Sequence, residues 1–181
     1  MKHTWLVSTG NFASGVLPRR SVVDGQYLDR DDPALLAITD FTREHPVTVD
    51  AERQIDDALT DMIRLGVRAM LVYQDNRIVG LITSYDIQGE RPMQFLQSSN
   101  FSHHRDIRVA DIMTPWDSLT AIDWTAVQTM RAGDLLKLLE DAGLSHLMVV
   151  EPDPTHGACV IRALVSRARL IRQLTGLRRT G

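Results

Sequence analysis

Two stretches of the chain, GVRAMLVY at residues 66–73 and GLSHLMVV at residues 143–150, share one pattern and decide the fold. Each begins with a glycine, which is typical of a helix end, and continues as a short apolar run, which is typical of a buried strand. The two stretches lie 77 residues apart. Because similarity at a fixed separation is the signature of a repeated unit, the sequence predicts two copies of one fold.

A second pair of stretches supports the duplication. GLITSYDI at residues 80–87 resembles ALVSRARL at residues 163–170, at a separation of 83 residues. The extra residues fall between the two matching blocks, where the connection of a hairpin tolerates insertions. The duplication therefore extends through a second strand and into a following helix.

The surrounding residues complete each copy. Apolar residues at helical spacing over 55–63 predict a helix before the first block, with Asp50 as a plausible N-cap and Gly66 as its stop. The expected strands are 70–73 and 78–83 in the first copy, and 147–150 and 160–166 in the second. A closing helix is expected over 167–174 of the second copy. The first strand of the second copy stays open between residues 119–122 and 126–130.

Each copy thus reads as strand, helix, strand, strand, helix. A unit of this size cannot bury both faces of its sheet alone, so we expect an α/β fold in which the two copies pack together through their sheets. The predicted organisation is an N-terminal extension (1–40), a first repeat (41–98), a linker (99–108) and a second repeat (109–176). The extension caps the module or joins a dimer, and the sequence leaves both alternatives open.

Composition excludes several classes of function. The chain has 181 residues, of which 44% are hydrophobic and 24% charged, and its net charge of −3 is unlike that of a protein that neutralises many phosphates of a nucleic acid. No apolar run approaches the roughly 20 residues of a membrane helix, and no signal sequence is recognised. Cys159 is the single cysteine, so no disulfide can form within the chain, and we expect a packed thiol. A cytoplasmic protein is expected.

Three motifs give the arrangement a family likeness: VADIMT at 109–114, LSHL at 144–147 and GLITSYD at 80–86. With their order and duplication, residues 40–175 resemble a tandem pair of CBS (cystathionine-beta-synthase) domains, also called a Bateman module, with no catalytic domain. The resemblance implies pseudo-twofold related repeats that bind an adenine nucleotide (AMP, ADP or ATP) between them. It also implies a homodimer that regulates a protein partner in trans.

Thr83 and Asp86 are the leading ligand contacts. A hydroxyl and free amides at a helix N-terminus can meet phosphate, and a carboxylate one turn into the helix can accept hydrogen bonds from both ribose hydroxyls. The same residues could alternatively serve as helix caps, an interpretation that we favour less. The resemblance further implies that His146, on the other repeat, lies near the phosphates of the pocket that holds Asp86, although an apolar strand also suits a core histidine.

The second copy departs from the motif. Ser166 keeps the hydroxyl, but Arg169 stands where the carboxylate is expected, Ala163 replaces the glycine, and Ala69 is the counterpart of His146. An arginine cannot accept hydrogen bonds from ribose hydroxyls. We therefore expect one intact nucleoside pocket, and a second pocket that is empty or binds phosphate alone.

No combination of residues predicts an enzyme or a metal centre. Neither a nucleophile with its base nor a carboxylate pair stands at persuasive spacing, and His103, His104 and Asp106 are expected to be solvated. The arginine-rich C-terminal run from Arg162 onward is expected to be a solvated helix face and tail. The alternative to a nucleotide sensor is a ligand-free scaffold for dimerisation or partner docking.

Overall fold

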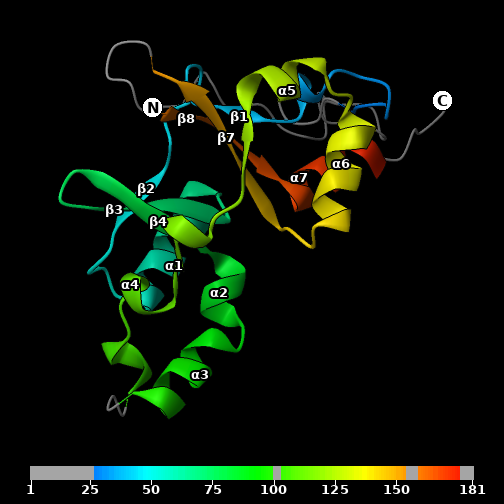
Figure 1. Cartoon of the computed structure of the whole chain (residues 1–181). Coiled ribbons are helices and arrows are strands. Elements are labelled where there is room, and N and C mark those ends of the chain that lie inside the picture. Colours follow the sequence, from blue (N-terminus) through cyan, green and yellow to red (C-terminus); the bar gives the residue numbers. More distant parts are fainter. Residues whose placement is uncertain (1–26, 100–102, 154–158, 176–181) are drawn as a thin grey trace, which may run out of the picture.

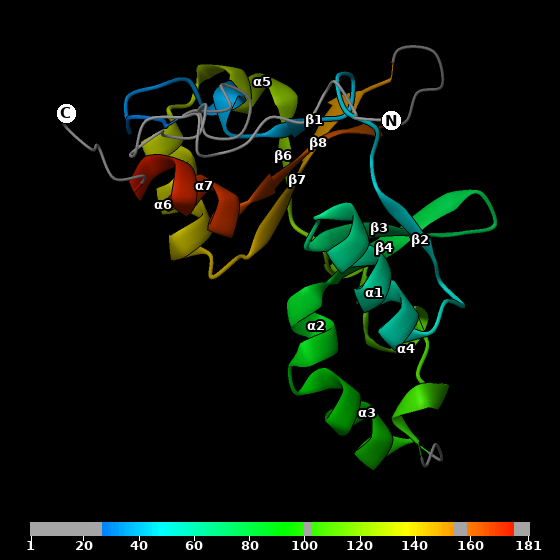
Figure 2. The same cartoon turned by 180° about the vertical axis from the view of Figure 1, so that it is seen from behind.

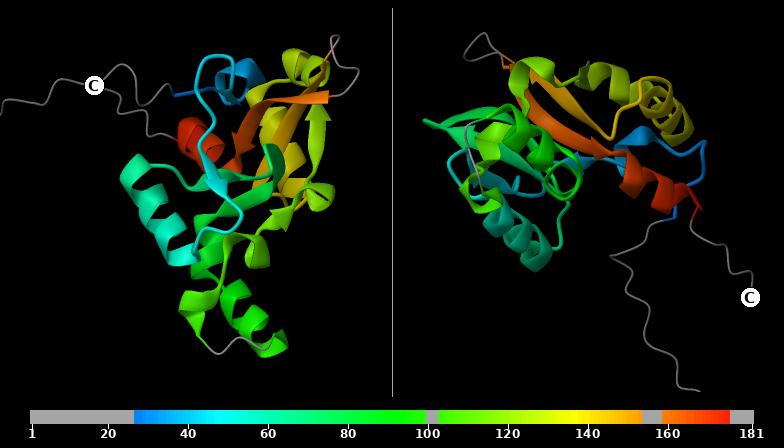
Figure 3. Two further views of the ribbon diagram at one scale, coloured as in Figure 1. Left: turned by 90° about the vertical axis from the view of Figure 1, so that its left-hand side faces the viewer. Right: turned by 90° about the horizontal axis from the view of Figure 1, so that it is seen from below.

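The protein was analysed as a computed structural model, which describes residues 27–99, 103–153 and 159–175. It has two lobes, each built on a four-stranded sheet with helices on one face (Figure 1). Figure 2 shows the same two lobes from behind, and Figure 3 shows them from the side and from below. The predicted α/β fold of two repeats is confirmed.

The first sheet has the strand order β2-β3-β4-β5. Its strands are β2 (Thr48–Asp50), β3 (Ala69–Gln74), β4 (Arg77–Thr83) and β5 (Thr114–Pro115). The helices of this lobe are α1 (Ile55–Leu65), α2 (Ser84–Gln88), α3 (Arg91–Ser98) and α4 (Val109–Ile112). A tight turn joins β3 to β4, and its two central residues, Asp75 and Asn76, both have positive φ, as polar turn residues tolerate.

The second sheet has the strand order β1-β8-β7-β6. Its strands are β1 (Thr39–Asp40), β6 (Ala121–Asp123), β7 (His146–Pro152) and β8 (Cys159–Ser166). The helices of this lobe are α5 (Trp124–Thr129), α6 (Ala132–Asp141) and α7 (Arg167–Thr175). Of the two candidates for its first strand, residues 119–122 overlap β6, whereas residues 126–130 lie mostly in α5.

The two sheets have equivalent patterns of pairing. In each, the first strand pairs parallel with the second, and the second pairs antiparallel with the third. The fourth strand, however, comes from the segment that precedes the other repeat: β5 joins β4, and β1 joins β8. Gly80 permits the first of these pairings, because a Cβ there would lie 2.5 Å from the carbonyl oxygen of Thr114.

Alternation along the strands produces the cores. On β3, Met70 and Val72 face the helices of the first repeat, while Leu71 packs with residues of the other sheet. On β7, Leu147 and Val149 face the helices of the second repeat, and Met148 packs across the interface. Because successive residues of a strand point to opposite faces, both sheets are buried on both sides. The repeats pack through their sheets, as predicted.

Packing crosses the predicted boundaries at residues 40 and 108. Leu28, Ala34 and Ile38, from the predicted N-terminal extension, lie in the core of the second repeat. Conversely, Ile107 and Val109, at the predicted junction of linker and second repeat, lie in the core of the first. The segment before each repeat therefore belongs structurally to its neighbour. Residues 1–26 of the extension, with its capping and dimer alternatives, lie outside the described residues.

The helix ends refine two further expectations. Gly66 ends α1 in the left-handed conformation at φ 69°, and Gly143 follows α6 at φ 65°, as the shared pattern predicts. The proposed cap at Asp50 is wrong, because α1 begins at Ile55 with Gln54 as its N-cap. Asp50 instead accepts a hydrogen bond from the amide of Glu52 in the turn after β2.

In the described part of the chain, no helix is long and apolar enough to cross a membrane.

Candidate ligand-binding site

A cavity of about 780 Å³ lies between the two repeats. The first repeat contributes the end of α1, the start of β3 and the first turn of α2 to its lining, and the second contributes the start of β7 and the first half of α7. The segment around β1 closes a further side. Three of the five predicted site residues, His146, Ser166 and Arg169, line this cavity, whereas Thr83 and Asp86 do not.

Thr83 and Asp86 form a capping box at the start of α2. The hydroxyl of Thr83 accepts from the amide of Asp86 at 3.2 Å, and Asp86 Oδ2 accepts from the amide and hydroxyl of Thr83 at 2.8 and 2.7 Å. The other oxygen, Oδ1, lies 3.1 Å from Arg91 Nη1. Both carboxylate oxygens of Asp86 are therefore engaged. Ser84 and Tyr85, which lie between Thr83 and Asp86 in the sequence, line the cavity instead. The helix-cap interpretation of these two residues has direct geometric support.

Arg91 connects Asp86 to the segment that precedes the second repeat. Besides its ion pair with Asp86, its Nη1 donates to the carbonyl oxygen of Ile112 at 2.8 Å and to Thr114 Oγ1 at 3.1 Å. Thr114 belongs to β5, the strand that precedes the second repeat. Asp86 is thereby linked through one side chain to the segment exchanged between the repeats.

His146 begins β7 and faces the cavity beside Ser166, its partner across the β7–β8 ladder. Its Nδ1 lies 3.2 Å from the hydroxyl of Ser145. Burial lowers the pKa of His146; the negative charge of Asp86 opposes this shift and the positive charge of Arg167 adds to it. The charges of Asp86 from the first repeat and Arg167 from the second therefore act on His146 in opposite directions.

Arg169 reaches the cavity from the first turn of α7. Its Nη1 donates to Thr39 Oγ1 at 2.7 Å, and Thr39 belongs to β1 and also lines the cavity. This bond joins α7 of the second repeat to the exchanged strand. Within the described ranges this is the one side-chain hydrogen bond of Arg169, and the expectation of a simply solvated arginine face is wrong at this position.

Further basic residues that sequence reasoning missed line the same cavity. Arg68 comes from the turn before β3, Arg172 from α7, and His45 from the segment after β1. Among the described residues that line the cavity, Glu44 is the only carboxylate. The lining therefore carries an excess of positive charge in a chain whose net charge is −3. An anionic ligand suits this chemistry.

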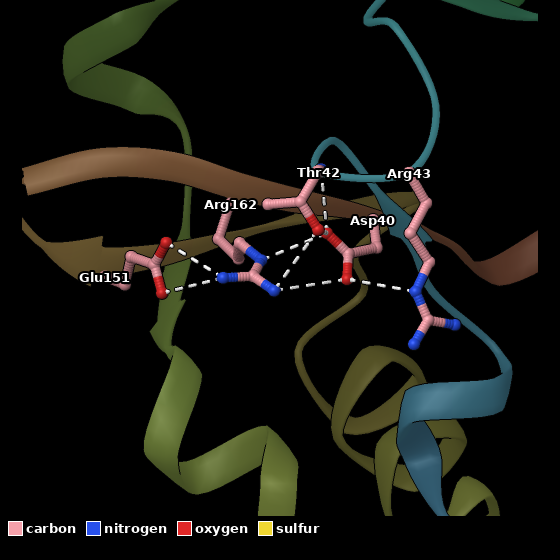
Figure 4. A network of polar contacts seen from close by, with 5 residues as sticks. All are labelled: Asp40, Thr42, Arg43, Glu151 and Arg162. Carbon is pink, nitrogen blue, oxygen red and sulfur yellow. Dashed lines mark hydrogen bonds and ion pairs between the residues drawn. The ribbon is translucent and has the colours of Figure 1, made fainter.

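Beside the cavity, a network of ion pairs holds β1 against β8 in the second sheet (Figure 4). Arg162 of β8 donates from Nε to Asp40 Oδ1 at 3.0 Å and from Nη1 to Glu151 Oε1 at 3.1 Å. Its guanidinium also lies 4.3 Å from the centre of the Trp124 ring. The expectation that Arg162 is part of a solvated face is therefore wrong: it is a paired residue of a strand.

This network lowers the pKa of Asp40. Partial burial alone would raise the pKa, but hydrogen bonds from Arg162 and Thr42, together with the charge of Arg162, lower it from 3.8 to about 2. The ionised form is thus favoured in the folded protein. The network consequently stabilises the fold more strongly while Asp40 is charged.

We expect acid to remove this contribution. Because the folded pKa lies below the unfolded one, the stabilisation is complete above the unfolded value of 3.8 and is lost as the pH falls through about 2. Its size is about 2 kcal/mol. Urea unfolding of wild type and Asp40→Asn at several pH values measures it, and the difference between the two proteins should shrink toward zero across this range. A difference that stays constant down to about pH 2 would contradict the assignment.

Other candidates from the sequence, namely Cys159, His103 and His104, do not line the cavity. Cys159 is exposed on β8, so the expected packed thiol is wrong. His103 and His104 pair with different carboxylates, Asp106 at 3.6 Å and Asp56 at 3.4 Å. Within the described ranges, no group of three or more histidine, cysteine, aspartate or glutamate residues could hold a metal ion.

Comparisons with known proteins agree with this architecture. The family model of the CBS domain matches residues 38–91. No curated protein matches the chain. Among solved structures, an uncharacterised conserved protein from Pyrococcus horikoshii is 19% identical, with a TM-score of 0.54 over 85% of this chain and 98% of that one.

Two further solved structures share the fold. A protein with CBS domains from Burkholderia ambifaria is 20% identical, with a TM-score of 0.53 over 75% of this chain and 87% of its own. The CBS domain of a bacterial CNNM/CorC-family Mg²⁺ transporter, solved with ATP, is 19% identical, with a TM-score of 0.51 over 81% of this chain and 89% of its own. Residues 38–91 thus form a CBS domain, and the chain as a whole has the fold of a tandem CBS module.

Proposed function

We propose that this chain is a non-catalytic, cytoplasmic regulatory module that binds an adenine nucleotide between its repeats. A partner protein regulated in trans would read the resulting change in the packing of the repeats or of a homodimer. The observation that carries the proposal is the cavity of about 780 Å³ between the repeats, whose charged lining is predominantly cationic. Nucleotides combine a flat apolar base with charged phosphates, and this cavity offers groups for both.

The lining is chemically divided. Phe41, Val67 and Leu164 present apolar surface that suits a base, while Arg68 and Arg169 present guanidinium groups that suit phosphate. The hydroxyls of Ser84 and Ser166 add hydrogen-bonding groups from the two repeats. The ATP complex of the transporter CBS domain, which shares this fold, supports a nucleotide as the class of ligand.

The position of the cavity supports a regulatory role. A ligand there would touch both repeats and also Thr39 of the exchanged strand β1. Such a ligand changes the free energy of one relative arrangement of the repeats more than that of another, which is the requirement for a conformational signal. The bond between Arg169 and Thr39 is one contact that a bound anion would reorganise.

The ligand-free scaffold remains the second candidate, and one observation favours it. Thr83 and Asp86 are fully accounted for by the capping box and the ion pair with Arg91, so their presence requires no ligand. Apolar side chains are also exposed on α1, where Ile63 is 73% and Leu65 is 53% accessible. A scaffold that dimerises or docks through such a surface would use the same fold without a nucleotide.

Thermal unfolding with AMP, ADP, ATP, S-adenosylmethionine and cyclic dinucleotides separates the two functions. A nucleotide that binds the folded state stabilises it by about 2.7 kcal/mol at a concentration of 100 times its Kd, so the melting temperature of the wild type should rise with concentration. If none of these compounds shifts the melting temperature, the scaffold is the better interpretation.

Asp86→Ala tests whether this carboxylate also contacts the ligand. The substitution should lower the ligand-free stability by about 1 kcal/mol, because a cap is lost, so each ligand shift must be measured from the variant's own baseline. Asp123→Ala is the matched control: Asp123 caps α5 by accepting from the amide of Thr125 at 2.8 Å and does not line the cavity. Because Asp86 does not line the cavity, we expect both variants to keep the full shift; a shift lost only in Asp86→Ala would show that this carboxylate contacts the ligand.

A further inference from the structure

Asp86 and Arg169 occupy equivalent places in the two repeats. Each is the third residue of the helix that follows the third strand of its sheet, namely α2 after β4 and α7 after β8. The strand partners agree as well, since Thr83 pairs with Ala69 and Ser166 pairs with His146. The exchange of a carboxylate for a guanidinium is therefore a difference at one structural position, and only Arg169 lines the cavity.

The folding of α7 does not account for Arg169. An acidic residue in the first helical turn is favoured by the helix dipole, and Asp86 uses this effect in α2, whereas the first turn of α7 contains no acidic residue. In the described part of the chain, no carboxylate pairs with Arg169, whose hydrogen bond goes to the neutral hydroxyl of Thr39. This guanidinium lies at the cavity with its charge uncompensated.

Its surroundings add positive charge. Arg172, one helical turn further along α7, and Arg68 of the first repeat line the same cavity. The side chain of Arg172 donates to the carbonyl oxygen of Ala168 at 3.3 Å, and Arg68 forms no ion pair within the described residues. Arginines of like charge repel one another, so an anion bound among them is favoured.

The two residue types select different forms of ribose. A carboxylate accepts hydrogen bonds from free hydroxyls, and a guanidinium donates two parallel hydrogen bonds to a phosphate. Dinucleotide-binding proteins use the same exchange, with an acid for a free 2′-hydroxyl and an arginine for a 2′-phosphate. Arg169 at the cavity therefore disfavours a free ribose diol and favours a phosphate at that place.

We infer that the cavity selects a nucleotide whose ribose carries a phosphate at its 2′ or 3′ position, with Arg169 as the residue that recognises this phosphate. Arg172 and Arg68 contribute further positive charge to the same ligand. This inference rests on the proposed function, because it takes a nucleotide to be the ligand of the cavity, and it adds which class of nucleotide is bound.

Calorimetric titration of the full chain with matched ligands tests the inference. Adenosine 3′,5′-bisphosphate and adenosine 2′,5′-bisphosphate carry the same number of phosphates as ADP, but they place one of them on the ribose. We expect one of the bisphosphates to bind about tenfold or more tightly than ADP, as charge-assisted hydrogen bonds of this kind typically give. AMP reports the affinity without a second phosphate.

Arg169→Asp should reverse the order of affinities, because it restores an acceptor for the ribose hydroxyls and repels a ribose phosphate. Arg169→Gln, which removes the charge and keeps much of the size, should abolish the preference. Arg105→Asp is the control for net charge: Arg105 lies in the 3₁₀ turn His104–Asp106, outside the cavity, and its substitution should leave the order unchanged.

The possible outcomes distinguish the two proposals. Tight binding of ADP or AMP with no gain from a ribose phosphate would overturn this inference and leave the proposed function standing. A preference for the bisphosphate that survives in both Arg169 variants would overturn the role of this arginine. If none of the nucleotides binds, the proposed function fails and the inference fails with it.

Discussion

Arg162→Ala is expected to lower the free energy of unfolding by about 2–4 kcal/mol. The substitution leaves the carboxylates of Asp40 and Glu151 without the cation that separates them, and the Trp124 ring loses its guanidinium contact. The side chain of Arg162 is only 22% exposed, so solvent screens these charges incompletely. Removal of one partner from a partly buried pair costs much more than the pair itself contributes, because the remaining charges stay desolvated.

The effect should be largest at β1, since the network fastens this two-residue strand to β8. Chemical denaturation gives the total loss of stability, and hydrogen exchange of the amide of Phe41, which donates to the carbonyl oxygen of Arg162, gives the local one. Arg64→Ala is the matched control. Its ion pair with Asp61 lies on the surface, where Arg64 is 73% exposed, so the expected change is within about 0.5 kcal/mol. Equal losses in the two variants would contradict a special role for the network.

The sequence predicted the repeated unit well because its signals are local. Gly66 and Gly143 each end a helix immediately before a run of apolar residues, and both adopt the left-handed conformation that such a stop requires. The hairpin around Asp75 and Asn76 follows from turn residues between two apolar runs. Each of these signals lies within a few residues of the structure that it specifies.

The exchange of edge strands could not be predicted in the same way. β1 and β5 are two residues long, too short to show any periodicity. Their positions depend on partners elsewhere in the fold: Thr39 pairs with Leu164 and Thr114 with Leu81. The sequence carries no local signal for such a pairing. Chain order alone therefore assigns the segments around β1 and β5 to the wrong repeats.

The candidate site shows the same limit. Thr83 and Asp86 stood out because their motif is compact, but compactness also lets the two side chains bond to each other as a cap. Arg68 and Thr39 belong to no motif, and only the packing of the repeats brings them to the cavity beside Arg169. The pattern placed Arg162 in the expected strand 160–166, but its ion pairs depend on Asp40 and Glu151, which only the fold brings to it.

The second large effect is expected at the interface between the sheets. In the part of the chain that the structure describes, Leu71, Leu81 and Met148 are the fully buried members of the hydrophobic cluster that joins the repeats. Met148→Ala should lower the free energy of unfolding by about 2–4 kcal/mol, because it removes buried methylene groups and leaves a cavity. Since this cluster joins the two sheets, the two repeats should also unfold less cooperatively.

Met70→Ala provides the matched comparison. Met70 is 2% exposed and Met148 is 1% exposed, but Met70 faces the helices of the first repeat rather than the other sheet. We expect a similar loss of stability with a single unfolding transition for Met70→Ala, and a broadened or two-step transition for Met148→Ala, measured by calorimetry. If both variants unfold in one equally sharp step, the repeats are coupled by more than this cluster. The exchanged strands β1 and β5 would then carry the coupling, since each places a segment of the chain before one repeat into the sheet of the other.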